Sequence, residues 1–238
     1  MSDSATQFNG LFLELGVRTF HRREITVLTK DDIKGVAAMV PTPCKENAEG
    51  WDATDSLELD ETARMTENYI RAGIGVIAAC GTTGECAALL WEEKRAFVDA
   101  IVLVNRKRVP VFAGATALGT KETIQQMRGL RDVGADGAFV GLPLWQTPTI
   151  ENAVKYYADL GEAVPDMPIL VYANARVFKS DFPHSGKGWR RRRAPLSLPR
   201  CLIVMPTCWR IFVSRDTRLI SCRVRVLSTP LTKWRAQG

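Results

Sequence analysis

The sequence predicts an α/β fold that forms part of an eight-fold (β/α) barrel. Five strand-like segments alternate with helix-like segments between residues 33 and 183. Several of the strand-like segments are continuously apolar, which is typical of parallel strands covered on both faces. Short connections between them predict right-handed βαβ crossovers. Five units in series favour a barrel over a doubly wound sheet, and no Gly-x-Gly-x-x-Gly turn follows the first strand.

The predicted elements follow one another in a regular order. The predicted strands are Ile33 to Met39, Gly75 to Cys80, Val109 to Ala113, Gly137 to Val140 and Pro168 to Tyr172. The predicted helices are Asp60 to Gly73, Trp91 to Asn105, Thr120 to Gly134 and Thr149 to Val164. Phe97, Ile101 and Val104 repeat at helical spacing, Thr120 is expected to cap its helix, and Pro165 ends the last one.

The segment Gly81-Thr82-Thr83-Gly84-Glu85 follows the second predicted strand and leads to the next predicted helix. Its glycines supply conformational freedom, so that the threonine hydroxyls and backbone N–H groups are expected to face outward. Such groups suit a small carboxylate. Glu85 is expected in the first turn of the helix, where negative charge is favoured. The segment also fits a plain tight turn between a strand and a helix.

In a (β/α) barrel, the active-site residues lie at the carboxyl ends of the strands. Those positions here hold Pro41-Thr42-Pro43, Gly81 to Glu85, Gly114-Ala115-Thr116, Leu142-Pro143-Leu144-Trp145 and Tyr172-Ala173-Asn174. With Met39 to Pro43, Gly81 to Cys86, Trp91 to Arg95 and Phe178 to Pro183, this ordered set resembles the dihydrodipicolinate synthase / N-acetylneuraminate lyase family over about residues 33 to 183. It points to the aromatic branch, the trans-o-hydroxybenzylidenepyruvate hydratase-aldolases. The resemblance implies a TIM barrel of the class I aldolase type, which binds pyruvate as a Schiff base.

The resemblance also implies roles for individual residues. Thr82 and Thr83 would hold the pyruvate carboxylate. Tyr172 and Thr82 would be the catalytic residues, with Tyr172 relaying protons as the imine forms and the carbon–carbon bond breaks. Trp145 and Asn174 would line the pocket for the aromatic aldehyde. Two alternatives stay open from the residues alone: Tyr172 as a strand-end aromatic whose hydroxyl bonds the backbone, and Trp145 as a core residue. Trp145 stands where the synthase branch has a tyrosine, and Ala175 stands where the family has a proline.

The composition changes abruptly at His184. Residues 184–238 hold eleven Arg, two Lys, one Asp and no Glu, a net charge of +12, whereas the whole chain carries +6 and residues 1–183 therefore carry −6. The tail has no clear helical or strand period, and it includes the run Trp189 to Arg193. We interpret it as disordered or read out of frame. The expected division is an N-terminal extension at 1–32, a partial aldolase barrel at 33–183 and the basic tail at 184–238.

The tail lacks the lysine that a class I aldolase needs for its Schiff base. In the family this lysine lies close to thirty residues beyond the tyrosine, where the chain has Arg200 and no Lys between Lys187 and Lys233. Arginine stays protonated and is a poor nucleophile. An eight-fold barrel also needs roughly 250 residues. We therefore expect about five βα units, with open edges at the first and fifth strands, and no activity in this form.

The remaining features set the class of protein. No metal or organic cofactor is implied, because the imine itself serves as the electron sink. The six cysteines form no Cys-x-x-Cys pair and favour reduced thiols in the cytoplasm. Cys80 and Cys86 flank the threonine segment, where a nucleophilic thiol is an alternative to a structural one. The only histidines are His21 and His184, and residues 1–30 contain no long apolar run, so we expect no membrane span.

The sequence thus favours a lyase that cleaves an aromatic benzylidenepyruvate to an aromatic aldehyde and pyruvate, in a family-like homo-oligomer. One rival is a dihydrodipicolinate synthase or sugar-acid aldolase of the same family. A rival of another class is nucleic-acid binding by the basic tail, whose cations alternate with Trp189, Trp209 and Trp234. No nucleic-acid-binding motif accompanies those residues, which disfavours that rival.

Overall fold

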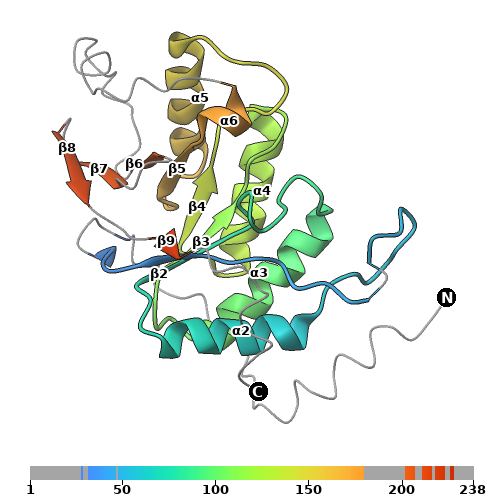
Figure 1. The fold of residues 1–238 in the computed structure, drawn as a ribbon. Coiled ribbons are helices and arrows are strands. Elements are labelled where there is room, and N and C mark those ends of the chain that lie inside the picture. Colours follow the sequence, from blue (N-terminus) through green and yellow to red (C-terminus); the bar gives the residue numbers. More distant parts are fainter. Residues whose placement is uncertain are drawn as a thin grey trace.

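The fold was analysed in a computed structural model, which describes residue 28, residues 32–46 and 48–179, and four short strands within residues 202–227. In these ranges the strands form one sheet in the order β8-β7-β6-β5-β4-β3-β2-β1-β9 (Figure 1). The first five strands pair in parallel, each with the next along the chain. They are β1 (Ala37–Met39), β2 (Val76–Ala79), β3 (Val111–Gly114), β4 (Gly137–Val140) and β5 (Ile169–Ala173).

A helix follows each of the five parallel strands. They are α2 (Leu59–Arg71), α3 (Trp91–Asn105), α4 (Thr120–Asp132), α5 (Ile150–Ala163) and the single-turn α6 (Ala175–Phe178). The four long helices lie side by side on one face of the curled sheet (Figure 1). Strand–helix alternation with parallel neighbours is the architecture of an incomplete TIM barrel, which confirms the predicted fold class.

Alternate strand residues face opposite sides of the sheet and enter two apolar clusters. The outer cluster joins strand residues such as Ile77 and Val171 to the helices and contains Phe97 and Ile101 of α3. The inner cluster contains Ala37, Val76, Phe112, Phe139 and Leu170, with Met39 and Tyr172 packed against it. Because side chains alternate along β5, Tyr172 shares the concave face with Leu170. This alternation directs the Tyr172 hydroxyl to the inside of the half-barrel.

The residues that cap the helices agree only in part with the sequence pattern. Thr149, the first residue of the predicted helix, is the cap of α5, since its Oγ1 accepts a hydrogen bond from the Asn152 backbone N–H at 3.3 Å. The prediction that Thr120 caps its helix is wrong. Gly119 is the cap residue, with φ −156°, and Thr120 is the first helical residue. None of the helices in the described ranges has the length and apolar character needed to cross a bilayer.

The prediction that Glu85 lies in the first turn of a helix is also wrong. Glu85 adopts a left-handed backbone conformation with φ 53°, which redirects the chain, and turns continue to Leu89 before α3 begins at Trp91. Glu93 occupies the first turn instead, and its Oε2 accepts a hydrogen bond from the Leu90 backbone N–H at 2.8 Å. The loop between β2 and α3 is therefore longer than the pattern suggests.

Four short strands of the basic tail extend the sheet on both sides. These are β6 (Leu202–Pro206), β7 (Ile211–Arg215), β8 (Arg218–Cys222) and β9 (Val226–Leu227). β6 pairs in parallel with β5, β7 and β8 follow antiparallel, and β9 pairs in parallel with β1. The expected open edges at β1 and β5 thus have partners, because strand pairing needs only free backbone N–H and C=O groups.

Several predicted features fall outside the described residues. They include the N-terminal segment up to residue 27, the arginine run at 190–193, and the position of Arg200 where the family has its lysine. The expected division of the chain into extension, partial barrel and tail stays a prediction.

Candidate active site

Three of the residues predicted for the site meet at the carboxyl ends of β2 and β5. The Tyr172 hydroxyl lies 3.0 Å from Thr82 Oγ1, in the loop after β2. It also accepts a hydrogen bond from Asn174 Nδ2 at 2.9 Å, from the residue that follows β5. The alternative that the Tyr172 hydroxyl bonds the backbone is wrong, since both of its partners among the described residues are side chains.

The Tyr172 ring is held by two other aromatic rings. Its centroid lies 4.6 Å from that of Phe139 on β4 and 5.5 Å from that of Phe178 on α6, the latter edge-on at 87°. Gly141 makes room for the Phe178 ring, because a Cβ at Gly141 would lie 1.9 Å from Phe178 Cζ. Tyr172 stays only partly buried. The ring is therefore fixed while its hydroxyl remains available to a ligand.

The threonine loop is tightly bent and leaves both threonines exposed. Cys80 before it and Glu85 within it have positive φ values of 51° and 53°, which are uncommon for residues other than glycine. Thr82 and Thr83 are exposed, whereas Gly81 and Gly84 on either side are buried. Among the described residues, no acceptor is found for the backbone N–H groups of Thr82 and Thr83. The loop therefore presents amide and hydroxyl donors to solvent, as a carboxylate requires.

Two threonines that sequence reasoning left without a role tie the neighbouring loops together. Thr42, after β1, is buried and donates its hydroxyl to the Gly84 carbonyl oxygen at 2.9 Å. Thr116, after β3, accepts a hydrogen bond from the Gly141 backbone N–H at 2.8 Å. Both stand at strand ends in the sequence, which is the signal that marks them as part of the site. They link the loops after β1 and β2, and those after β3 and β4.

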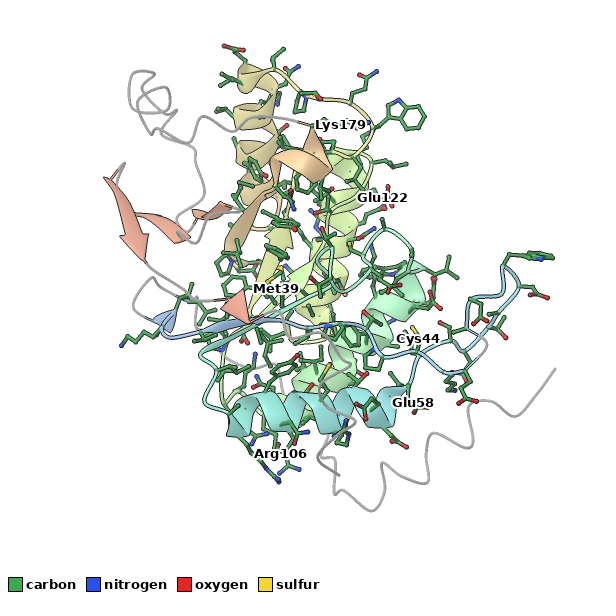
Figure 2. All side chains as sticks on the ribbon, in the orientation of Figure 1. Met39, Cys44, Glu58, Arg106, Glu122 and Lys179 are labelled. Atoms are coloured by element: carbon green, nitrogen blue, oxygen red, sulfur yellow. The ribbon has the colours of Figure 1, made fainter. Side chains whose placement is uncertain are left out.

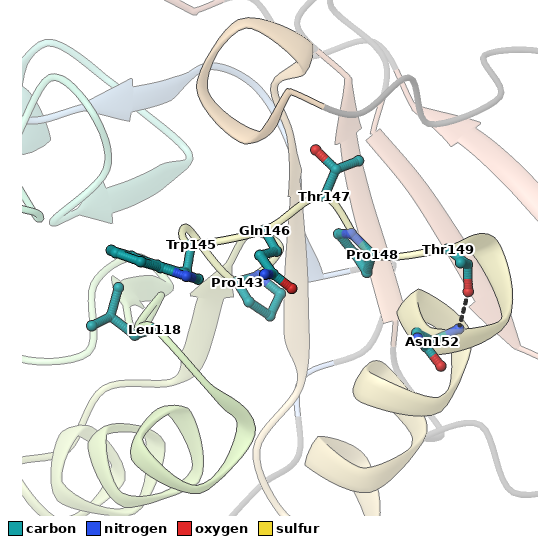
Figure 3. Close-up of a pocket in the computed structure, with 8 residues that line it drawn as sticks. All are labelled: Leu118, Pro143, Trp145, Gln146, Thr147, Pro148, Thr149 and Asn152. Atoms are coloured by element: carbon teal, nitrogen blue, oxygen red, sulfur yellow. Dashed lines mark hydrogen bonds between the residues drawn. The ribbon is translucent and has the colours of Figure 1, made fainter.

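The structure does not bring Trp145 to the Tyr172 hydroxyl. Its side chain is 78% exposed, so the alternative that Trp145 belongs to the core is wrong. It stands beside Leu118 at a shallow depression of about 320 Å³ (Figure 3). The rest of that lining comes from Pro143, Gln146, Thr147, Pro148, Thr149 and Asn152. No ring contact joins Trp145 to Tyr172 within residues 48–179.

The cysteines near the threonine loop are poorly placed to act as nucleophiles. Cys80 is buried, and burial raises the pKa of its thiol to about 12. A thiol needs to lose its proton to attack a carbonyl, so Cys80 is inert at neutral pH. Cys86 is partly buried, and its sulfur lies 3.9 Å from the Thr116 carbonyl oxygen. Cys80 is therefore a packing residue, which excludes the nucleophilic alternative for it.

None of the described lysines contacts the Thr82–Tyr172 pair. Lys94, which is buried on α3, donates a hydrogen bond to Gln126 Oε1 of α4 at 3.3 Å and so faces the helix layer. Lys179 is exposed just beyond α6 (Figure 2). In the described ranges, no group of three or more His, Cys, Asp or Glu side chains is arranged to hold a metal ion. The assembled chemistry is thus a tyrosine hydroxyl and a set of neutral donors.

Comparison with known proteins identifies the origin of this arrangement. A model of the dihydrodipicolinate synthetase family matches residues 34–178. The trans-O-hydroxybenzylidenepyruvate hydratase-aldolase of Sphingobium xenophagum is 47% identical over 160 residues, which are 67% of this chain and 49% of that protein. The trans-2'-carboxybenzalpyruvate hydratase-aldolase of Nocardioides sp. (strain KP7) is 44% identical over 152 residues, 64% of this chain and 46% of that one.

A solved structure agrees with these sequence matches. PhdJ bound to substrate intermediate has a TM-score of 0.64 to this chain at 44% identity, over 65% of this chain and 48% of that one. The chain therefore spans about half the length of the relatives it matches. The predicted resemblance is confirmed: from the first parallel strand to α6, the chain belongs to the dihydrodipicolinate synthetase family.

Proposed function

We propose that the described residues form the keto-acid half of a lyase active site, that of a hydratase-aldolase acting on an aromatic benzylidenepyruvate. Two relatives that are 44–47% identical carry hydratase-aldolase names. The observation that carries the proposal is the hydrogen bond of 3.0 Å between Thr82 and Tyr172, which places a phenol beside the exposed donors of the threonine loop. In the reaction, water adds across the side-chain double bond, and retro-aldol cleavage then yields an aromatic aldehyde and pyruvate.

The roles follow from the chemistry of the groups. Thr82 and Thr83 bind the carboxylate of the keto acid through hydroxyl and backbone N–H donors, which are stronger toward an anion than toward a neutral group. Tyr172 accepts and returns protons at the keto carbon and at the hydroxyl that leaves as the aldehyde. We assign Trp145 to contact the aromatic end of the substrate, because its indole is exposed beside the apolar Leu118.

The bond-breaking step needs a primary amine to form an imine with the keto acid. The chain has Arg200 in the region where the resemblance places that amine. A guanidinium stays protonated in proteins and therefore does not form an imine with a keto acid. We therefore propose that this chain binds 2-oxo acids through the threonine loop without forming a covalent adduct. This separates two steps that a complete aldolase combines, which are recognition of the carboxylate and activation of the ketone.

Binding of pyruvate to the full 238-residue chain tests the recognition step. Ligand-observed NMR is expected to detect pyruvate bound to the unaltered chain and a loss of affinity of about tenfold or more in Thr82→Val, since a hydrogen bond to a charged group contributes about 1.5–3 kcal/mol. Thr54→Val is the matched control, because Thr54 is also exposed and lies in another loop. Equal affinity in Thr82→Val and Thr54→Val would contradict the proposed carboxylate site.

Borohydride reduction in the presence of pyruvate tests the second step. Mass spectrometry is expected to show no reduced pyruvyl adduct on this chain, and an adduct on the Sphingobium xenophagum hydratase-aldolase treated in parallel. Turnover of a benzylidenepyruvate is expected only in the second protein. A pyruvyl adduct on the 238-residue chain would overturn the proposal that it binds without covalent chemistry.

We further propose that the protein acts in the cytoplasm as a homo-oligomer. The support is the membership of the dihydrodipicolinate synthetase family and the exposed apolar side chains Leu118, Trp145 and Ile150, which are 61%, 78% and 52% exposed. Light scattering coupled to size-exclusion chromatography measures the assembly directly. A monomer at micromolar concentration would contradict this proposal and leave the carboxylate site unaffected.

A further inference from the structure

Asn174 occupies a position between the Tyr172 hydroxyl and the first turn of α6. Its side-chain nitrogen Nδ2 lies 2.9 Å from the Tyr172 hydroxyl. Its side-chain oxygen Oδ1 lies 3.3 Å from the Val177 backbone nitrogen. Asn174 thus links Tyr172, the proton carrier of the proposed function, to the start of a helix. The role in the wall of the aromatic pocket, which the resemblance implies for Asn174, stays a prediction beside this link.

The helix start determines which way the Asn174 amide points. The Val177 backbone N–H can only donate, and it is shared between two acceptors, the Asn174 Oδ1 and the Asn174 main-chain oxygen, the latter at 3.1 Å. The Asn174 main-chain oxygen also accepts from the Phe178 backbone N–H at 2.9 Å. An Nδ2 group in that place would set two donors against each other. Oδ1 therefore faces α6, and Nδ2 faces Tyr172. A group that only donates consequently points at the phenol oxygen.

The orientation of the amide in turn sets the direction of the next hydrogen bond. The Tyr172 hydroxyl has one proton, and the bond from Asn174 uses one of its lone pairs. Thr82 Oγ1, at 3.0 Å, is the only other partner of this hydroxyl among the described residues. Asn174 Nδ2 only donates, so Thr82 Oγ1 is the one acceptor within reach of the Tyr172 proton in the described part of the chain, and the proton goes to Thr82. The hydroxyl proton of Thr82, which is exposed, is then left to point out of the loop.

We infer that Asn174 is a positioning residue that gives the hydroxyl chain one direction, from Asn174 through Tyr172 to Thr82 and outward. The outward end of the chain is a donor, which is the group that a carboxylate requires. This consequence for the keto acid rests on the proposed function, whereas the direction of the chain does not. An aspartate at 174 would reverse the chain, because a carboxylate accepts from Tyr172 and Tyr172 then accepts from Thr82.

The tyrosine doublet in the Raman spectrum tests the direction without any ligand, because its intensity ratio reports whether a phenol hydroxyl mainly donates or mainly accepts. The chain has four tyrosines, and a Tyr172→Phe variant identifies the contribution of Tyr172. In the unaltered chain, Thr82→Val removes an acceptor and is expected to shift the ratio toward the accepting form. In an Asn174→Asp background, the same Thr82→Val change removes a donor and is expected to shift the ratio toward the donating form.

The reversal of sign between the two backgrounds is the expected result, and shifts of the same sign would overturn the inference. Asn174→Asp keeps an acceptor for the Val177 N–H, so the start of α6 is preserved, and circular dichroism confirms folding of each variant. Thr82→Ser restores the hydroxyl and is expected to restore the ratio seen in the unaltered chain. A purely structural role of Asn174 would not produce a sign reversal.

Pyruvate binding to the same variants distinguishes this inference from the proposed function. When Thr82 is present, Asn174→Asp is expected to weaken pyruvate binding by about tenfold. In a Thr82→Val background the same change is expected to weaken binding much less, since that background already lacks the outward donor. An equal loss in both backgrounds would mean that the new charge alone repels the anion and would overturn the functional consequence. If the unaltered chain binds no pyruvate, the proposed function fails, and the Raman result still decides the direction of the chain.

Discussion

Thr42 and Gly84 are joined by a buried hydrogen bond of 2.9 Å, from the threonine hydroxyl to the glycine carbonyl oxygen, across 42 positions of the chain. Thr42 follows β1, and Gly84 comes directly after the two exposed threonines in the loop that follows β2. The bond therefore fixes the loop that presents the donors of the site to the segment that follows β1. The position of Thr82 relative to Tyr172 depends on this anchor.

Removal of the Thr42 hydroxyl is expected to loosen the threonine loop. Thr42→Val keeps the shape of the side chain and leaves the Gly84 carbonyl without its buried donor, which costs about 1–3 kcal/mol in free energy of unfolding. Urea unfolding measures this loss, and pyruvate affinity is expected to fall with it. Thr42→Ser retains the hydroxyl and serves as the control. An unchanged unfolding midpoint in Thr42→Val would show that the bond does not anchor the loop.

Substitution of Gly84 tests the same loop by steric means. A Cβ at Gly84 would lie 3.0 Å from both the Cys80 backbone nitrogen and the Val40 carbonyl oxygen, neither of which yields easily. Gly84→Ala is expected to lower the free energy of unfolding by about 1–3 kcal/mol, as overpacking in cores does. Gly119→Ser is the control, since a Cβ there meets nothing within 4 Å and serine is a favourable helix cap. Equal stability of both variants would contradict the close packing.

Alkylation of the cysteines is expected to follow their burial. Cys44 is exposed, whereas Cys80 is buried and its burial raises the pKa of the thiol to about 12. With iodoacetamide at about pH 8, Cys44 is expected to react first and Cys80 only after unfolding in urea, because the thiolate is the reactive form. Mass spectrometry of tryptic peptides measures both rates. Reaction of Cys80 in the folded protein at a rate like that of Cys44 would contradict its assignment as a packing residue.

The carboxylate of Glu67 links stability to acid pH. Arg108 donates two hydrogen bonds to it, at 2.5 and 3.2 Å, and with Arg71 lowers the pKa of Glu67 from 4.5 to about 2. The folded state therefore binds this proton less readily than the unfolded state does. The stabilisation is complete above about pH 4.5 and is lost as the pH falls toward about 2.

Glu67→Gln is expected to reduce the loss of stability between these two pH values, measured by urea unfolding at intervals across the range. Glu92→Gln is the matched control, because Glu92 is exposed and forms no ion pair among the described residues. A pH profile of Glu67→Gln that coincides with that of the unaltered chain would contradict the proposed linkage.

The sequence was sufficient to predict the elements that depend on local pattern. Gly137–Val140 and Trp91–Asn105 coincide with β4 and α3. A short continuous apolar run favours a buried strand, and an apolar stripe at helical spacing favours a helix. The prediction for Glu85 is wrong, because nothing in the local pattern indicates the left-handed conformation that delays the helix. Thr120 was misplaced by one residue, because the extended Gly119 caps α4 without a side chain.

The candidate site was predicted in its residue types and only partly in its geometry. The position of Thr82 and Tyr172 at strand ends places them at one edge of a parallel sheet, and the structure brings them into contact. The link from Asn174 to Tyr172 was not predicted, because it depends on α6 turning back toward β5. The separation of Trp145 from Tyr172 was also not predicted, since the path of a loop after its strand has no periodic signal.

The Thr82 and Tyr172 hydroxyls are separated by 90 positions of the chain. Three helices and two further strands must assemble before the two oxygens meet, and contacts between such remote positions form late in folding. Occupancy of the keto-acid site consequently reports on completion of the whole half-barrel. A nascent or misfolded chain would already contain every residue of the site and still show no affinity for its ligand.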